Sequence, residues 1–110
     1  MSAFGEWLLA FAVSQAIEVP IYLYATRGRW YVSVLASTWT HPIVWFVFPL
    51  ITPLSWGWVG MVEAAELFAV LVEASWLAYN KIRHALGWSL ISNAASLGLG
   101  LMFRNAWDWP

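Results

Sequence analysis

The feature that most constrains this chain is a long run without Asp, Glu, Lys or Arg, from Trp30 to Val62. A helix that crosses the hydrocarbon core of a bilayer needs about 20 apolar residues. At about 1.5 Å per residue, this run is too long for one such helix. Pro49, Pro53 and Gly57 in its middle mark a turn. The run therefore predicts two spanning helices joined by a short turn.

Composition extends this interpretation to the whole chain. Of its 110 residues, 62% are hydrophobic and 10% are charged, whereas an ordinary soluble domain is about 25% charged. So few charges cannot cover the surface of a water-soluble globule of this size. The net charge of −1, without a basic patch, argues against a nucleic-acid partner, and the absence of cysteine excludes a disulfide scaffold. We expect an integral membrane protein rather than a soluble enzyme domain.

Apolar length and turn signals divide the chain into four predicted helices within a single transmembrane domain over residues 1–110. The fold class is therefore expected to be all-α, an integral membrane four-helix bundle. No basic residue precedes the first apolar stretch, so it is interpreted as a span and not as a cleavable signal peptide. The four helices are expected at about residues 4–24, 30–48, 58–79 and 85–103.

Basic residues predict the orientation of these helices in the bilayer. Arg27 and Arg29 lie between the first two helices, whereas Lys81 and Arg83 lie between the last two. The loop between the second and third helices has no basic residue, so the positive-inside rule predicts cytoplasmic basic loops and both termini outside. Aromatic residues near the helix ends then form two belts, Trp56, Trp58, Trp107 and Trp109 outside and Tyr24, Trp30 and Tyr79 inside.

The two halves of the chain share features that suggest an internal two-helix repeat. A shift of 55 residues also brings the two basic loops into register. Two parallel helix pairs related by an axis along the membrane normal are a known arrangement in transporters. The shift aligns Gly5 with Gly60, Glu18 with Glu73, Tyr24 with Tyr79 and Ser37 with Ser92.

Acidic side chains inside the predicted spans are the candidates for a functional site. The third helix carries Glu63, Glu66 and Glu73, and the first helix carries Glu18. A charged side chain at mid-helix costs roughly 2.5–3.5 kcal/mol on insertion, so the third helix should insert poorly by itself. Glu66 and Glu73 are two turns apart on one face of this helix. Ionisable residues within a membrane usually face the bundle interior and indicate a functional site.

The other helices also have polar positions, and two of these lie beside prolines. Asn93 belongs to a stripe of small and polar residues on the fourth helix. Pro20 closely follows a glutamate and Pro42 directly follows a histidine, so helix kinks are expected at both prolines. Irregular backbone at membrane depth is tolerated where it is buried or lines a cavity. The predicted polar centre consists of Glu18, His41, Glu66, Glu73 and Asn93.

These residues also have interpretations that involve no transport or catalysis. Glu18 lies two turns from Arg27 and could form a structural ion pair with it. His41 could be a neutral, hydrogen-bonded packing residue, or an axial ligand to a haem or chlorophyll. Asn93 and the serines near it could simply join helices. The sequence has no paired Cys or His at metal-ligand spacing and leaves open whether a metal binds.

Two functions fit this pattern. The first is a proton- or cation-handling transporter or channel that acts as an oligomer, because four short helices enclose little room. The second is a non-catalytic structural or cofactor-contacting subunit of a larger respiratory or photosynthetic membrane complex, because the chain has almost no extramembrane mass. An intramembrane enzyme has the least support, since no nucleophile–base pair is recognisable. The expected partners are the lipid bilayer and either further copies of the chain or a larger complex.

One arrangement of short motifs runs through all four predicted helices. It comprises Glu18 in the first helix, Thr40-His41-Pro42 in the second, Glu66 and Glu73 in the third, and Asn93 with Ser96 in the fourth. This arrangement resembles small polytopic bacterial membrane proteins, and the likeness covers most of the chain. The resemblance implies a location in the bacterial inner (cytoplasmic) membrane and carries no activity.

Overall fold

The computed structural model describes residues 3–107, and within this range the chain is helical with no strand. The all-α prediction is confirmed. Side chains are described from Gly5 to Met102 except for Glu6, so the belt positions predicted for Trp107 and Trp109 lie outside them. The chain forms four helical arms: α1 (Ala3–Ala25), a second arm that begins with α2 (Trp30–Thr38), α4 (Gly57–Tyr79) and α5 (Ala85–Trp107).

The second arm, which the sequence predicts as one helix with a kink at Pro42, is interrupted in its middle. α2 ends at Thr38, and after a turn the chain continues as a π-helix, η1 (Ile43–Val47), and then as a short helix, α3 (Phe48–Ile51). Pro42 lies at the start of η1, where it lacks the N–H group that would continue the α-helical hydrogen bonds. The other proline at which a kink is expected, Pro20, lies inside α1, which runs through it as one helix.

A short turn joins the second arm to α4. Thr52 and Pro53 have extended backbone, and a single turn of 3-10 helix, η2 (Leu54–Trp56), follows them. Gly57 then begins α4 with φ 70° and ψ −176°, a conformation that is essentially limited to glycine. Pro49, which the sequence places in this turn, lies instead within α3.

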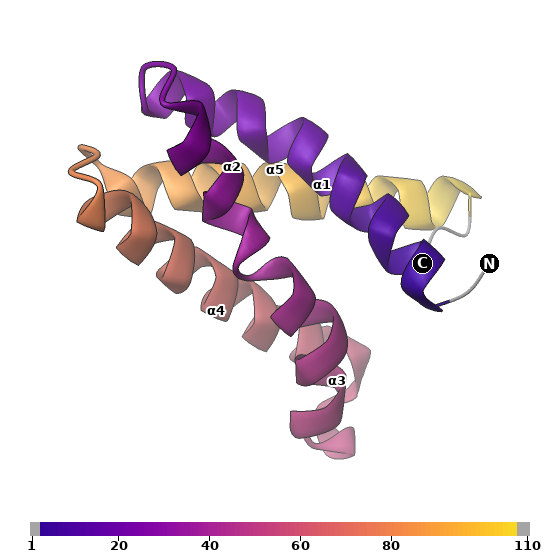
Figure 1. Cartoon of the computed structure of the whole chain (residues 1–110). Helices are drawn as coiled ribbons and strands as arrows, with labels where there is room; N and C mark the ends of the chain where they lie inside the picture. The colour runs from indigo at the N-terminus through magenta and orange to yellow at the C-terminus, as the bar shows by residue number, and fades with distance from the viewer. Residues whose placement is uncertain (1–2, 108–110) are drawn as a thin grey trace.

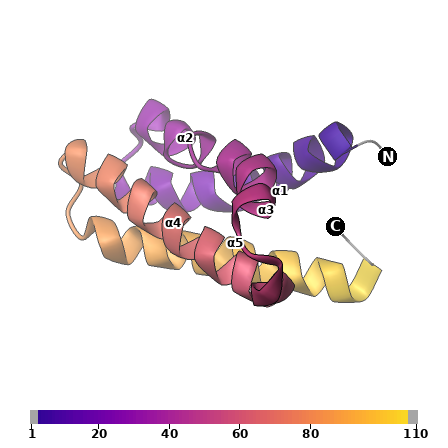
Figure 2. The same ribbon diagram turned by 90° about the horizontal axis from the view of Figure 1, so that it is seen from below.

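The four arms pack as a bundle with alternating directions. α1 and α4 each contact both α2 and α5, so the four arms form a closed ring of contacts. The loops around residues 26–29 and 80–84 lie at one end, here called the loop end, and the first residues of α1 and the last of α5 lie at the other (Figure 2). There, α3 and the start of α4 diverge from α1 and α5, so this end is splayed (Figure 1).

The bundle has polar side chains inside and large apolar side chains outside. Among the described side chains, nine polar or charged residues are buried, compared with eight hydrophobic ones. Another 24 large hydrophobic residues are exposed. Such an apolar surface is atypical of a soluble protein and suits contact with lipid. The fully buried apolar residues form a small group near the loop end, here called the loop-end cluster: Tyr22, Val32, Ala36 and Leu77.

Three segments of the described chain are long and apolar enough to cross a membrane: Trp7–Ala25, Trp30–Ile51 and Ala85–Met102. Together with the apolar surface, they support an integral membrane protein. The 23-residue helix α4 is not among them, because its three glutamates lower its hydropathy and raise its charge. α4 is also the helix that the sequence predicts to insert poorly alone.

We expect isolated α4 to insert into a membrane poorly, and to insert well once Glu66 and Glu73 are replaced by leucine. Each replacement should lower the apparent insertion free energy by about 3 kcal/mol, because a charged group near the helix centre is costly and leucine is favourable. The measurement is the glycosylation ratio of each helix placed singly in a host membrane protein, with α1 as the reference. Equal insertion of α1 and unmodified α4 would contradict this expectation.

Candidate functional site

Polar side chains from all four arms meet around Glu73 in the middle of the bundle. Glu73 is only 1% exposed, and its carboxyl group accepts three hydrogen bonds. The Tyr22 hydroxyl and the Asn93 amide donate to Oε1, the amide over 3.1 Å, and the Thr40 hydroxyl donates to Oε2 over 2.8 Å. These donors belong to α1, α5 and the second arm. One acceptor on α4 therefore holds the other three arms together.

Glu18 reaches the same centre from α1. It is 4% exposed, and its Oε1 atom has no hydrogen-bond partner among the described residues. Its side chain lies close to Glu73 and to Ser96 on α5. Two ionised carboxylates this close repel each other, so a proton on one of them would stabilise the pair. The ion pair with Arg27 is not formed, because Arg27 is exposed in the loop while Glu18 is buried.

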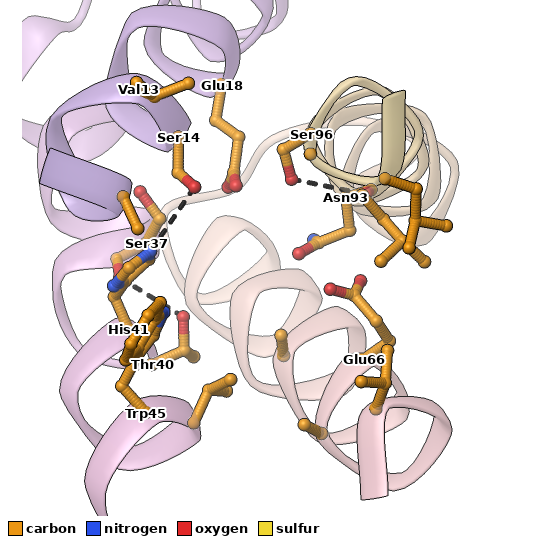
Figure 3. A pocket seen from close by; sticks show the side chains of 18 of the residues that line it. Val13, Ser14, Glu18, Ser37, Thr40, His41, Trp45, Glu66, Asn93 and Ser96 are labelled. Carbon is orange, nitrogen blue, oxygen red and sulfur yellow. Dashed lines mark hydrogen bonds between the residues drawn. The ribbon is translucent and has the colours of Figure 1, made fainter. Parts of the chain in front are cut away.

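Glu66 joins Glu18 and Glu73 in lining a pocket of about 570 Å³, here called the glutamate pocket. The side chains of Glu18 and Glu66 point into it from different helices (Figure 3). Glu66 is half-buried and makes no hydrogen bond with any described residue. Among the side chains that the structure describes, no lysine or arginine lines the pocket. The described part of the pocket therefore gathers three acidic groups without a positive charge beside them.

The glutamate pocket runs along α4 from Trp58 to Glu73. At 1.5 Å per residue this length is roughly 22 Å, a large part of the about 30 Å of a bilayer core. Pro49 and Trp58 line it near the splayed end, and both are exposed. At the other end, the hydrogen bonds of Glu73 and then the loop-end cluster fill the bundle. The pocket is thus reached from the splayed end and closed toward the loop end.

His41 lies on the wall of the glutamate pocket, and both of its ring nitrogens have partners. Trp7 donates from Nε1 to Nδ1 over 3.1 Å, and Nε2 lies 3.3 Å from the Ser14 hydroxyl (Figure 3). Because Nδ1 accepts a hydrogen bond, a neutral ring carries its hydrogen on Nε2, which faces Ser14. Ligation of a haem or chlorophyll would require the loss of one of these bonds. The geometry fits the interpretation of His41 as a neutral packing residue.

All five residues of the predicted polar centre line the glutamate pocket, but they do not form one network. Asn93 donates a hydrogen bond to Glu73 at its closed end and Glu18 lies beside them, whereas Glu66 and His41 form no hydrogen bond with these residues or with each other. Among the described side chains, no group of three or more His, Asp or Glu could hold a metal ion. The acidic groups are therefore distributed along the pocket wall and do not surround one point.

Two residues of the centre, Tyr22 and Thr40, are absent from the predicted site. Tyr22 follows Glu18 by four residues, and this helical spacing places both side chains on one face of α1, a signal that could have identified it. Thr40 lies in the turn that interrupts the second arm. Its inward direction depends on that interruption: Pro42 predicts a kink there, but local sequence does not specify that Thr40 turns toward Glu73.

Comparison of the chain with protein-family models, with curated proteins and with solved structures finds no match. The function must therefore be inferred from the chemistry of the glutamate pocket.

Proposed function

We propose that this protein is a proton- or cation-handling membrane transporter. The observation that carries the proposal is the meeting of Glu18, Glu66 and Glu73 in one pocket whose described lining contains no lysine or arginine. Carboxyl groups inside a membrane protein are costly and typically belong to ion pathways or proton relays. A cation in the pocket, or protons on the carboxyl groups, would compensate their charge.

The shape of the glutamate pocket favours a transporter over an open channel. A channel needs a continuous path across the bilayer, whereas buried side chains close this pocket toward the loop end. The closed end contains the hydrogen bond from Tyr22 to Glu73 and the loop-end cluster. In a transporter with alternating access, such contacts would open on one side as the other side closes.

The paired carboxyl groups suggest how a proton and a cation would exchange. Glu18 and Glu73 lie close together at the closed end of the pocket, where a proton on one of them would relieve their repulsion, and the Glu66 side chain faces the pocket without a hydrogen bond to any described residue. A cation that enters beside Glu66 would be attracted by all three carboxyl groups and would favour release of such a proton. One proton would then leave the pocket for each monovalent cation that binds.

Orientation and an internal repeat belong to the same proposal. We place both termini outside and the basic loops in the cytoplasm of a bacterial inner membrane, with the bundle built from two related hairpins. In support, α1 and α4 are both 23 residues long and run in the same direction (Figure 2). Residues aligned by the 55-residue shift have similar surroundings: Glu18 and Glu73 are buried side by side, and Ser37 and Ser92 are both buried. Two hairpins of this kind could rock against each other to open opposite ends.

The alternative, a subunit of a larger respiratory or photosynthetic complex, would be favoured by a polar helix face that points away from the bundle. Of the glutamates described on α4, Glu63 is exposed, while Glu66 and Glu73 face the pocket. Two of these three glutamates therefore face the chain's own bundle, which supports the transporter. Exposed apolar residues such as Leu67 and Leu71 on α4 are available for contact with lipid or with further copies in an oligomer.

The proposal is tested by reconstituting the protein in liposomes that contain a pH-sensitive dye. A cation gradient should drive proton movement through wild-type protein, and Glu66→Gln should reduce the rate about tenfold or more, because the amide cannot ionise. The fold should survive, since Glu66 makes no hydrogen bond within the described residues. Different monovalent and divalent cations then identify the preferred ion.

The matched control is Glu63→Gln, which removes an exposed carboxyl group one turn away on the same helix. It should leave the rate of proton movement unchanged. Unchanged flux in inserted, folded Glu66→Gln protein, or no flux with any tested cation in wild-type protein, would refute the proposal.

A further inference from the structure

A second pocket lies at the loop end of the bundle, between the two basic loops. It has a volume of about 770 Å³ and is here called the loop pocket. No Asp or Glu of the described residues lines it, and Tyr24, Ile82 and Trp88 provide part of its apolar wall. The lining also contains five basic side chains: Arg27, Arg29, Lys81, Arg83 and His84.

Arg29 joins the two loops and so gives the loop pocket a defined shape. Its Nη1 atom donates to the backbone carbonyl of Asn80 over 2.8 Å, and Nη2 lies 3.5 Å from Oδ1 of the same residue. The side chains of Arg27, Lys81 and Arg83 make no hydrogen bond or ion pair with any described residue. Three positive charges thus surround one cavity without compensation, an arrangement that attracts an anion.

The backbone of the loop pocket is strained at three of its basic positions. Arg27, Lys81 and His84 have φ values of 56°, 62° and 57°, in the left-handed region that L side chains rarely adopt. Arg27 and Lys81 are the second residues after the ends of α1 and α4, the position at which glycine commonly terminates a helix. Charged side chains are therefore present where a glycine would be less strained. Strain of this kind clusters at ligand clamps.

We propose that the loop pocket binds a phosphate-bearing anion. Guanidinium and ammonium groups are the usual protein ligands of phosphate, and here they come from both loops. The pocket also lies where exposed Tyr24, Trp30 and Tyr79 mark a membrane interface. Basic pockets between helices at this depth suit lipid phosphates, and the Tyr24 and Trp88 rings, 5.6 Å apart, offer an apolar wall for the rest of the lipid. The phosphate could belong to an anionic phospholipid headgroup or be free in solution.

The test is thermal unfolding of the full chain in a non-ionic detergent, followed by tryptophan fluorescence, with three probes. Short-chain phosphatidylglycerol and inorganic phosphate are the anions, and short-chain phosphatidylcholine, whose headgroup has no net charge, is the control. We expect at least one anion to raise the unfolding temperature in a saturable way. Arg27→Gly and Lys81→Gly should each weaken its apparent affinity about fivefold.

These glycine variants separate a loss of binding from a loss of folding. Without anion they should unfold at the wild-type temperature or above it, because glycine relieves the left-handed strain. Arg104→Gln, which removes a positive charge outside both loops, should leave the affinity unchanged. Stabilisation by phosphatidylglycerol alone identifies a lipid site, and stabilisation by both anions identifies recognition of the phosphate itself. No saturable shift with either anion, an equal shift with phosphatidylcholine, or full affinity in the Arg27→Gly/Lys81→Gly double variant would overturn the proposal.

Discussion

Replacement of Glu73 by alanine is expected to lower the free energy of unfolding by about 2 to 5 kcal/mol, since a hydrogen bond between membrane helices contributes about 0.6 to 1.7 kcal/mol. Glu73 accepts three such bonds, from Tyr22, Thr40 and Asn93, which belong to the three other arms. The variant leaves these donors buried without an acceptor. The measurement is equilibrium unfolding of the purified protein in mixed detergent micelles of increasing SDS content, followed by tryptophan fluorescence.

Two further variants make this result specific to the acceptor role of Glu73. Glu73→Gln keeps one carbonyl oxygen but presents an amide group to one of the donors, so its loss of stability should be smaller than that of alanine. Glu63→Ala, on the exposed face of the same helix, should change the free energy of unfolding by no more than about 0.5 kcal/mol. Equal losses in Glu63→Ala and Glu73→Ala would show that Glu73 does not hold the arms together.

Ala69→Phe is expected to reduce cation-driven proton movement to the rate of protein-free liposomes, although all three glutamates remain. Ala69 is 5% exposed, lines the glutamate pocket, and lies between Glu66 and Glu73 on the same face of α4. A phenyl ring at this position would occupy the space through which an ion must pass between the two carboxyl groups. The measurement is the same liposome assay, with the amount of inserted protein determined for each variant.

The control for added volume is Leu67→Phe, because Leu67 is 62% exposed on the outside of α4. It should transport at the wild-type rate. Overpacking at Ala69 is expected to reduce stability by about 1–3 kcal/mol, so unfolding of each variant is measured as well. Ala65→Leu fills the same pocket with a smaller side chain and should also slow transport. Wild-type flux in folded Ala69→Phe protein would exclude the glutamate pocket as the route.

The membrane character of the helices could be predicted from sequence because it depends on local composition. Inside a bilayer, backbone groups have no water to bond, so a long apolar stretch must satisfy them within one helix. The segments Trp7–Ala25, Trp30–Ile51 and Ala85–Met102 follow this rule directly. Glutamates that keep α4 out of this group are equally visible in the sequence.

The effect of the two prolines could not be predicted in the same way. Both remove a helical hydrogen bond, yet α1 continues through Pro20 while the second arm is interrupted before Pro42. Contacts with the other arms explain why the backbone behaves differently at Pro20 and at Pro42. The turn before Pro42 lets Thr40 donate to Glu73, and this bond exists only once α4 has packed beside the second arm.

By itself, the sequence determined that the chain is helical, that much of it can span a membrane, and that glutamates such as Glu18, Glu66 and Glu73 lie well inside its predicted helices. These properties follow from the order of residues along one helix at a time. Only the tertiary structure decided that Glu18, Glu66 and Glu73 share a pocket while Glu63, three residues before Glu66, is exposed. The physical reason is that a helix that is apolar around most of its circumference does not identify its inward face. That face is selected by the hydrogen bonds and packing that the other arms supply.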